Sequence, residues 1–201
     1  MCISKNLSLF SFTVAIVSSI ALLKFGNAPE NRVISYYMMF VGLMQLVDYG
    51  AWIDLTCTKG FNRLSSTIGP LLNNIQPIIF LALAYYYLQS SSIINDKLLV
   101  ALGIIYGGYM IYKYIQYLNI GDLCIRTDSL EHLIWQWGSN YNYWGYHLLF
   151  LFGIINFYKY KGLLVFYIAA YILYNISIKN EIWCFLVTGI PFINLLVQKL
   201  F

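Results

Sequence analysis

Long apolar runs follow one another along the chain, and short polar segments separate them. Seven of these runs come close to the roughly 17–25 residues that an α-helix needs to cross a bilayer. They are Leu7–Phe25, Val33–Leu55, Ser65–Leu88, Leu98–Leu118, Tyr143–Tyr158, Gly162–Ile178 and Ile182–Leu200. Seven such helices would use about 140 positions, which leaves tails and short connections but no separate soluble domain. The pattern predicts an all-α, polytopic membrane protein in which residues 1–201 form one helical bundle.

One connection is much longer than the others. It runs from Asn119 to Asn142, between the fourth and fifth predicted helices. Within it, apolar residues recur at helical spacing at Leu130, Leu133, Ile134 and Trp137. This spacing predicts a short amphipathic helix that lies in the membrane interface.

Composition agrees with a membrane protein and excludes several other classes. Hydrophobic residues make up 60% of the chain and charged residues 10%, whereas soluble domains average about 45–50% and 25%. A disordered chain is excluded by the same numbers. The 12 Lys and Arg residues are scattered and form no basic face, so nucleic acid is not an expected partner, and the lipid bilayer is.

The charges near the span ends bear on which end faces the cytoplasm. With seven spans the two tails lie on opposite sides, and Lys and Arg are equally numerous on both. Lys113 falls within its helix, however, and Arg126 belongs to the longest loop. Short loops on the C-terminal side then hold a slight excess, which predicts a cytoplasmic C-terminus and a lumenal or extracellular N-terminus.

The four cysteines all fall toward the N-terminal side of the predicted bundle. If that side is lumenal, disulfides can form there. Four cysteines allow three pairings, and the first expected is Cys57 with Cys124, in the two loops best able to meet. The alternative is that the cysteines are reduced and buried as small hydrophobes.

Two ionisable residues lie inside predicted spans and stand apart from the other charges. Asp48 lies past the middle of the second span, and Lys113 past the middle of the fourth. At about 1.5 Å per residue, both stand some 6–8 Å from the midplane, toward the N-terminal side. Ionisable groups in a membrane usually face a bundle interior or a water-filled cavity, so we expect Asp48 and Lys113 to face each other, as an ion pair or across a ligand.

Polar residues follow the helix faces that carry these two charges. Gln45, Asp48 and Trp52 share one face of the second helix, and Pro70 and Pro77 flank the amides of the third. Prolines free backbone carbonyls and let a helix bend. The pattern predicts a polar cavity that opens toward the N-terminal side and suits a small polar or zwitterionic solute. Its lining residues are Gln45, Asp48, Trp52, Asn73, Asn74, Gln76, Tyr109, Lys113, Gln116, Tyr171, Tyr174, Trp183 and Asn194.

Other interpretations of the same residues stay open. Amides in a membrane often serve only to hold helices together by hydrogen bonds. The protein would then be a structural or scaffolding component of a membrane, with no ligand. An enzyme is less expected, because the chain has two histidines and no motif typical of hydrolases or P-loops. A mixed metal site from Asp54, Cys57, Cys124, His132 and Cys184 lacks a close ligand pair, so we predict no metal and no cofactor.

Two short segments hint at an internal duplication. Pro70–Asn73 in the third helix and Pro191–Asn194 in the seventh share the pattern Pro-x-x-Asn, four helices apart. This loosely resembles the SWEET and PQ-loop transporters, which have a 3+1+3 arrangement and asparagines of helices 3 and 7 at the substrate site. The PQ signature itself is absent, because residues 76 and 77 read Gln-Pro.

A second resemblance covers most of the chain, on short motifs. The motifs are the stretch Met44–Cys57, then Asn62, Ser65, Gln76–Pro77, His132–Trp135 and Ile182–Cys184. The chain resembles a family of uncharacterised multi-pass membrane proteins encoded by giant DNA viruses, with Asp48 where a glutamate is expected. The resemblance implies a protein of virion or host membranes, and it implies no activity.

Overall fold

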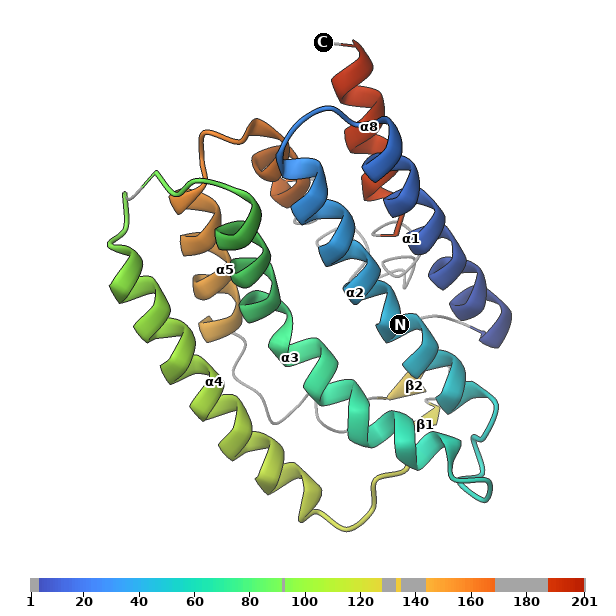
Figure 1. The fold of residues 1–201 in the computed structure, drawn as a ribbon. Coiled ribbons are helices and arrows are strands. Elements are labelled where there is room, and N and C mark those ends of the chain that lie inside the picture. The colour runs from blue at the N-terminus through green and yellow to red at the C-terminus, as the bar shows by residue number, and fades with distance from the viewer. Residues whose placement is uncertain (1–3, 92, 128–132, 135–143, 169–187, 201) are drawn as a thin grey trace.

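The computed structural model is a bundle of helices with one small β-hairpin (Figure 1). It describes residues 4–91, 93–127, 133–134, 144–168 and 188–200. The helices are α1 (Lys5–Phe25), α2 (Glu30–Trp52), α3 (Phe61–Tyr87), α4 (Asp96–Leu118), α5 (Trp144–Asn156) and α8 (Ile190–Leu200), and the strands are β1 (Arg126–Thr127) and β2 (Leu133–Ile134). A further helical stretch covers residues 161–168.

The helices run alternately in opposite directions, which gives the bundle two distinct ends (Figure 1). We call one the disulfide end, which holds residues 53–60 and 119–127. We call the other the far end, which holds residues 26–29, 88–91, 93–95 and 157–160. The first four helices match the predicted spans closely. Each begins two to four residues earlier than predicted, so the all-α prediction is confirmed for this part of the chain.

In the part of the chain that the structure describes, three helices are long and apolar enough to cross a membrane: Lys5–Phe25, Phe61–Tyr87 and Asp96–Leu118. Helix α2 is as long, with 23 residues, but its inward-facing Ser35, Gln45 and Asp48 make it less apolar. Helix α5 has 13 residues, which is short for a crossing. Most of the sixth predicted span and residues 182–187 of the seventh lie outside the described residues. The rest of the seventh span includes α8.

The predicted amphipathic helix is wrong at the two of its positions that the structure describes. Leu133 and Ile134 form β2, which pairs antiparallel with β1, Arg126 opposite Ile134. Leu133 is 2% exposed and Ile134 48% exposed, as expected when successive side chains point to opposite faces of a strand. The apolar spacing thus reflects strand alternation there. Leu130 and Trp137 lie outside the described residues.

Helix starts follow local capping chemistry. The hydroxyl of Ser4 accepts from the N–H of Leu7 before α1, and the side chain of Asn95 accepts from the N–H of Lys97 at the start of α4. Before α3 the chain passes through Gly60 at φ 83°, a left-handed conformation that glycine adopts without steric cost.

Small residues let α1 and α2 approach closely. Ser11, Ala15 and Ser18 are fully buried on α1, and a Cβ atom added at Gly42 of α2 would lie 3.0 Å from the Cβ of Ala15. Small residues at such crossings are typical of helix packing in membranes. The hydroxyl of Ser18 also donates to the carbonyl of Thr188, just before α8.

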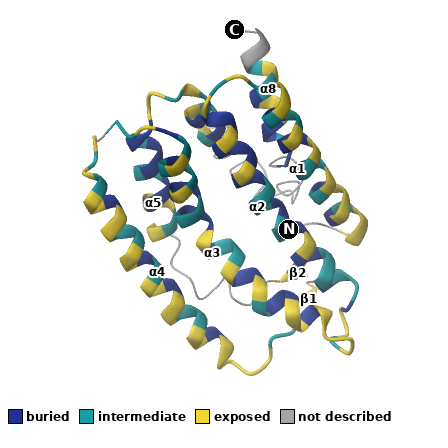
Figure 2. Cartoon of the chain, viewed as in Figure 1, coloured by how far each residue is buried: buried dark blue, intermediate teal, exposed yellow. Residues whose placement is uncertain are grey.

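Burial is uneven across the bundle (Figure 2). Helix α2 is buried along much of its length, whereas α4 shows exposed residues on most turns. An aromatic core between α2, α3 and α5 includes Tyr37, Phe80 and Phe150, with the Phe80 and Phe150 rings stacked at 4.5 Å. The polar residues discussed below therefore sit around α2 and α3, at the centre of the bundle.

Candidate functional site

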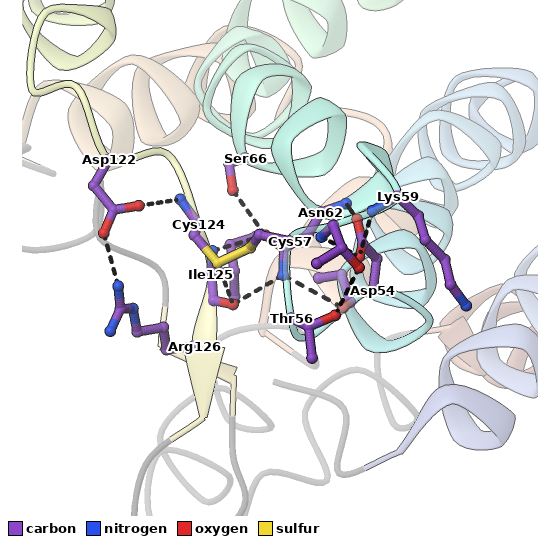
Figure 3. The surroundings of a disulfide bond; sticks show 12 residues. Asp54, Thr56, Cys57, Lys59, Asn62, Ser66, Asp122, Cys124, Ile125 and Arg126 are labelled. Atoms are coloured by element: carbon purple, nitrogen blue, oxygen red, sulfur yellow. Dashed lines mark hydrogen bonds and ion pairs between the residues drawn. A yellow bond between two sulfur atoms is a disulfide. The ribbon is translucent and has the colours of Figure 1, made fainter.

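The disulfide joins the loop after α2 to the loop after α4 (Figure 3). It links Cys57 to Cys124 across 67 residues of sequence, with Cα atoms 6.0 Å apart, within the usual range for a disulfide. The first pairing predicted from the sequence is thereby confirmed. The bond fixes the C-terminal end of α4 to the turn between α2 and α3.

Beside the disulfide, the side-chain amide of Asn62 forms two hydrogen bonds with the backbone of Ile125, as a neighbouring β-strand would. Asn62 is fully buried. Its Oδ1 accepts from the N–H of Ile125 at 2.7 Å, and its Nδ2 donates to the carbonyl of the same residue at 2.9 Å (Figure 3). A primary amide carries one donor and one acceptor group, so it can pair with both backbone polar groups of one residue. Asn62 thus holds the 119–127 loop against the start of α3.

Asp54 organises the turn that carries Cys57. The residue is 2% exposed, and its carboxylate accepts from the backbone N–H groups of Thr58, Lys59 and Asn62 at 3.0–3.2 Å (Figure 3). Burial alone would raise the pKa of this carboxyl, but the hydrogen bonds from backbone N–H groups outweigh it, so the pKa lies below the ordinary value of 3.8.

The lowered pKa of Asp54 predicts an acid-dependent loss of stability. A carboxyl whose pKa is lower in the folded state stabilises the fold fully above its unfolded pKa, and that contribution is lost as pH falls through the folded pKa. Asp54→Asn should therefore lower the melting temperature near pH 7, and the gap to the parent protein should close as pH falls below about 3.8. Melting curves in detergent from pH 7 down to acid would show this.

The matched control for Asp54 is Asp122→Asn. Asp122 lies in the loop joined to Cys57, but it is 56% exposed in an i, i+4 ion pair with Arg126, and such pairs contribute little. We expect almost no change for that variant. A constant gap between Asp54→Asn and the parent at every pH would contradict the assigned role.

Tyrosines of α4 donate to backbone carbonyls of α3 near its two prolines. Pro70 has no N–H and cannot bond the carbonyl of Ser66, four residues earlier; the hydroxyl of Tyr117 donates to that carbonyl at 3.2 Å. Tyr114 donates to Thr67 at 3.1 Å. Three residues before Pro77, the hydroxyl of Tyr106 donates to the carbonyl of Asn74 at 2.9 Å.

These contacts correct the predicted face of α4. The buried face carries Leu99, Tyr106, Met110 and Tyr117, rotated away from the predicted stripe, so that Tyr109 and Gln116 are exposed. Gln116 donates to the hydroxyl of Tyr112, its neighbour one turn earlier. From this rotated face, three tyrosine hydroxyls donate to carbonyls of α3. One of these carbonyls, that of Ser66, is the one that Pro70 leaves without its helical N–H.

A group of phenols and one amide lies between α2, α3, α4 and α5. The side-chain oxygen of Gln76 accepts from the hydroxyl of Tyr146 at 2.6 Å. The hydroxyl of Tyr37 lies within hydrogen-bonding reach of that of Tyr146, with Tyr106 nearby. We name Tyr37, Gln76, Tyr106 and Tyr146 the phenol cluster. Each comes from a different helix, so the cluster forms only in the assembled bundle.

Asp48 and Gln45 extend this polar region along α2 toward the disulfide end. They are 4% and 5% exposed. From Tyr37 to Asp48 is 11 residues, or about 16 Å along the helix axis. Buried polar side chains therefore lie on α2 at successive depths within the apolar core.

The predicted pairing of Asp48 with Lys113 is not formed. Among the residues that the structure describes, no ion pair joins them, and the one salt bridge is Arg126 with Asp122. Helix α3 packs against both α2 and α4, so it separates the two charges. Lys113 is half-buried on α4. The sequence predicted a common depth for Asp48 and Lys113, but two residues at one depth need not lie on neighbouring helices.

Asn194 belongs to a different part of the bundle. Its side-chain amide donates to the side chain of Asn31 at 3.5 Å, and both residues are 2% exposed. Asn31 lies 17 residues before Asp48 on α2, or about 25 Å along the axis. The matching Pro-x-x-Asn patterns of the third and seventh predicted helices thus do not bring Asn194 to a site shared with Asp48.

The remaining predicted lining residues are placed as follows. Asn74 is 4% exposed, and its amide donates to the carbonyl of Pro70. Its Oδ1 has no hydrogen-bond partner among the described residues. Asn73 and Trp52 are half-buried. Tyr171, Tyr174 and Trp183 lie outside the described residues.

The mixed metal site loses two of its five proposed ligands. Cys57 and Cys124 are consumed by the disulfide, and the carboxylate of Asp54 is held by backbone N–H groups. No cluster of three or more His, Cys, Asp or Glu that could hold a metal lies within the described part of the chain. His132 and Cys184 lie outside it.

Sequence reasoning missed one buried polar hub at the far end. The amide of Asn156, fully buried, donates to Tyr85, Ser90 and Asp96, and its Oδ1 accepts from the N–H of Ile94. The hub holds the loop between α3 and α4 against the end of α5. The sequence did carry one signal of this cluster, because the polar Asn156 directly follows the apolar run Leu148–Ile155.

Comparison of the chain with family models, with curated proteins and with solved structures finds no match. The resemblances to giant-virus membrane proteins and to SWEET and PQ-loop transporters stay predictions.

Proposed function

We propose that the protein is a multi-pass integral membrane protein that binds or transports a small polar solute between α2, α3, α4 and α5. The observation that carries this proposal is Asp48, an acid 4% exposed within a 23-residue helix. An ionisable residue is costly inside a membrane and usually marks a ligand or ion pathway. Gln45 supplies a hydrogen-bonding group one turn earlier. The phenol cluster supplies others farther along the bundle, about 16 Å from Asp48 at Tyr37.

We also propose that the chain crosses the bilayer seven times, with the disulfide end in the lumen or outside the cell. The alternating direction of the described helices supports this course. The disulfide supports the orientation, since such bonds persist in oxidising compartments. The resemblance to giant-virus membrane proteins supports a location in a virion membrane or a host-cell membrane, and we include both in the proposal.

The proposed function predicts that ligand-dependent stabilisation requires the charge at Asp48. Purified protein in detergent would be heated with glucose, glycine betaine or putrescine, which represent neutral, zwitterionic and cationic solutes. We expect one class to raise the melting temperature of the parent protein, and Asp48→Asn to abolish that rise while the protein still folds. Uptake of the same solute into proteoliposomes would separate a transporter from a receptor.

Asp122→Asn is the control, because Asp122 is exposed in a loop at the disulfide end. It should respond to the solute like the parent. If Asp48→Asn also responds like the parent, the solute does not bind at Asp48, and the scaffolding alternative gains support.

A further inference from the structure

The far end of the bundle carries exposed cations beside aromatic rings. Lys24 ends α1, Arg32 and Lys97 lie in the first turns of α2 and α4, and Lys159 and Lys161 follow α5. All five are exposed. Because the helices alternate in direction, these positions gather at one end of the molecule (Figure 1).

Three of these cations lie over aromatic rings. Lys24 is 5.5 Å from the ring centre of Phe25, Arg32 is 6.0 Å from that of Tyr87, and Lys159 is 5.4 Å from that of Tyr160. Within the described residues, every cation–π contact is at this end. Aromatic rings of this kind favour the depth of lipid headgroups, so the cations are held at that depth.

The acidic residues at this end are turned inward. Glu30 is 7% exposed and accepts from the N–H of Gly162. The carboxylate of Asp96 accepts from Tyr85, Ser90 and Asn156. Neither acid neutralises the outer surface, so the exposed charge of the described far end is positive.

Contacts at this end join the segments that carry Arg32 and Lys159 to the end of α3. The N–H of Gln89 donates to the hydroxyl of Tyr160 at 3.0 Å, and the rings of Tyr36 and Tyr87 stack at 5.6 Å. A preformed arrangement loses less conformational freedom on binding than mobile side chains do.

We propose that this far end binds the headgroups of anionic lipids in the leaflet that surrounds it. Lys and Arg near a membrane surface attract anionic lipids, and the cytoplasmic leaflet is the anionic one. The disulfide at the opposite end gives the same orientation. This inference rests on the membrane insertion proposed above and is independent of any solute at Asp48.

The test measures lipid binding by native mass spectrometry in detergent, with phosphatidylglycerol or phosphatidylcholine as the probe. The variant is Lys24→Gln, Arg32→Gln and Lys159→Gln together, and the control is Lys5→Gln, Lys59→Gln and Arg63→Gln at the disulfide end. At about fivefold per cation, the far-end variant should bind phosphatidylglycerol about a hundredfold more weakly, with phosphatidylcholine unchanged. The control should stay within about twofold, and added salt should weaken only phosphatidylglycerol.

Equal losses in the two triple variants, or equal binding of the two lipids by the parent, would overturn the proposal. So would displacement of the lipid by inorganic phosphate, which would indicate a soluble anion as the ligand. Arg32→Lys keeps the positive charge and should keep phosphatidylglycerol binding. Loss of binding in that variant would contradict the proposed role of the charge and would indicate that the packing of Arg32 on Tyr87 is what binding requires. Insertion into phosphatidylcholine nanodiscs is measured separately, and failure there would reject membrane insertion itself.

Discussion

Replacing Cys57 and Cys124 with serine is expected to destabilise the protein by about 2–4 kcal/mol, measured as the free energy of unfolding in detergent. The disulfide closes a loop of 67 residues, and a crosslink of that length strongly restricts a soluble unfolded chain. Helices in a micelle keep part of their order on unfolding, which places the expected value below the soluble limit. Melting curves with and without a reductant should show the same difference in the parent protein.

The serine variant should still fold, because Asn62 also holds the 119–127 loop through Ile125. Adding Asn62→Ala should then cost more than it does in the oxidised parent, since the two attachments support the same loop. Thr56→Ala is the control, an exposed neighbour in the same turn. Free thiols at Cys57 and Cys124 in protein purified without reductant would contradict the assignment.

Removing the hydroxyls of Tyr106, Tyr114 and Tyr117 by substitution with phenylalanine should lower stability by about 2–3 kcal/mol. Each hydroxyl donates to a carbonyl of α3, and hydrogen bonds between membrane helices contribute about 0.6–1 kcal/mol each. Phenylalanine keeps the ring packing, so the loss reports the hydrogen bonds. Unfolding in a denaturing detergent would measure it.

The largest single loss should come from Tyr117→Phe, because Pro70 cannot bond the carbonyl of Ser66 in its place. Pro70→Ala restores an N–H for that carbonyl, so Tyr117→Phe should cost less in that background. Tyr112→Phe, on the exposed face of α4, should change stability by less than about 0.5 kcal/mol. Equal costs for Tyr117→Phe with and without Pro70 would exclude this explanation.

Helix positions were predictable because they depend on runs of apolar residues, a property of each segment alone. The four helices from α1 to α4 follow the predicted spans, and Cys57 and Cys124 were predicted to pair because the alternating course brings their loops to one end. Where only local pattern mattered, the sequence was sufficient.

Lateral relations between helices were not predictable in the same way. Asp48 and Lys113 were predicted to lie at the same depth, but α3 packs against both of their helices and separates them. The buried face of α4 includes Tyr117, which donates to the carbonyl that Pro70 frees on another helix. Asn62 and Asn156 find partners more than 55 residues away in sequence. Such partners are set by the three-dimensional course of the chain, which no local period encodes.

Helix α4 is attached very differently at its two ends. The disulfide fixes the end near Leu118, whereas the end at Asp96 is held by hydrogen bonds through Asn156, Ser90 and Tyr85. With 23 residues, α4 is about 34 Å long. A tilt of about 5° about its pinned end would move Asp96 by about 3 Å, beyond hydrogen-bonding range. If α4 moves away from the bundle, we therefore expect the movement to begin at the far end, while the end of α4 near the disulfide stays in place.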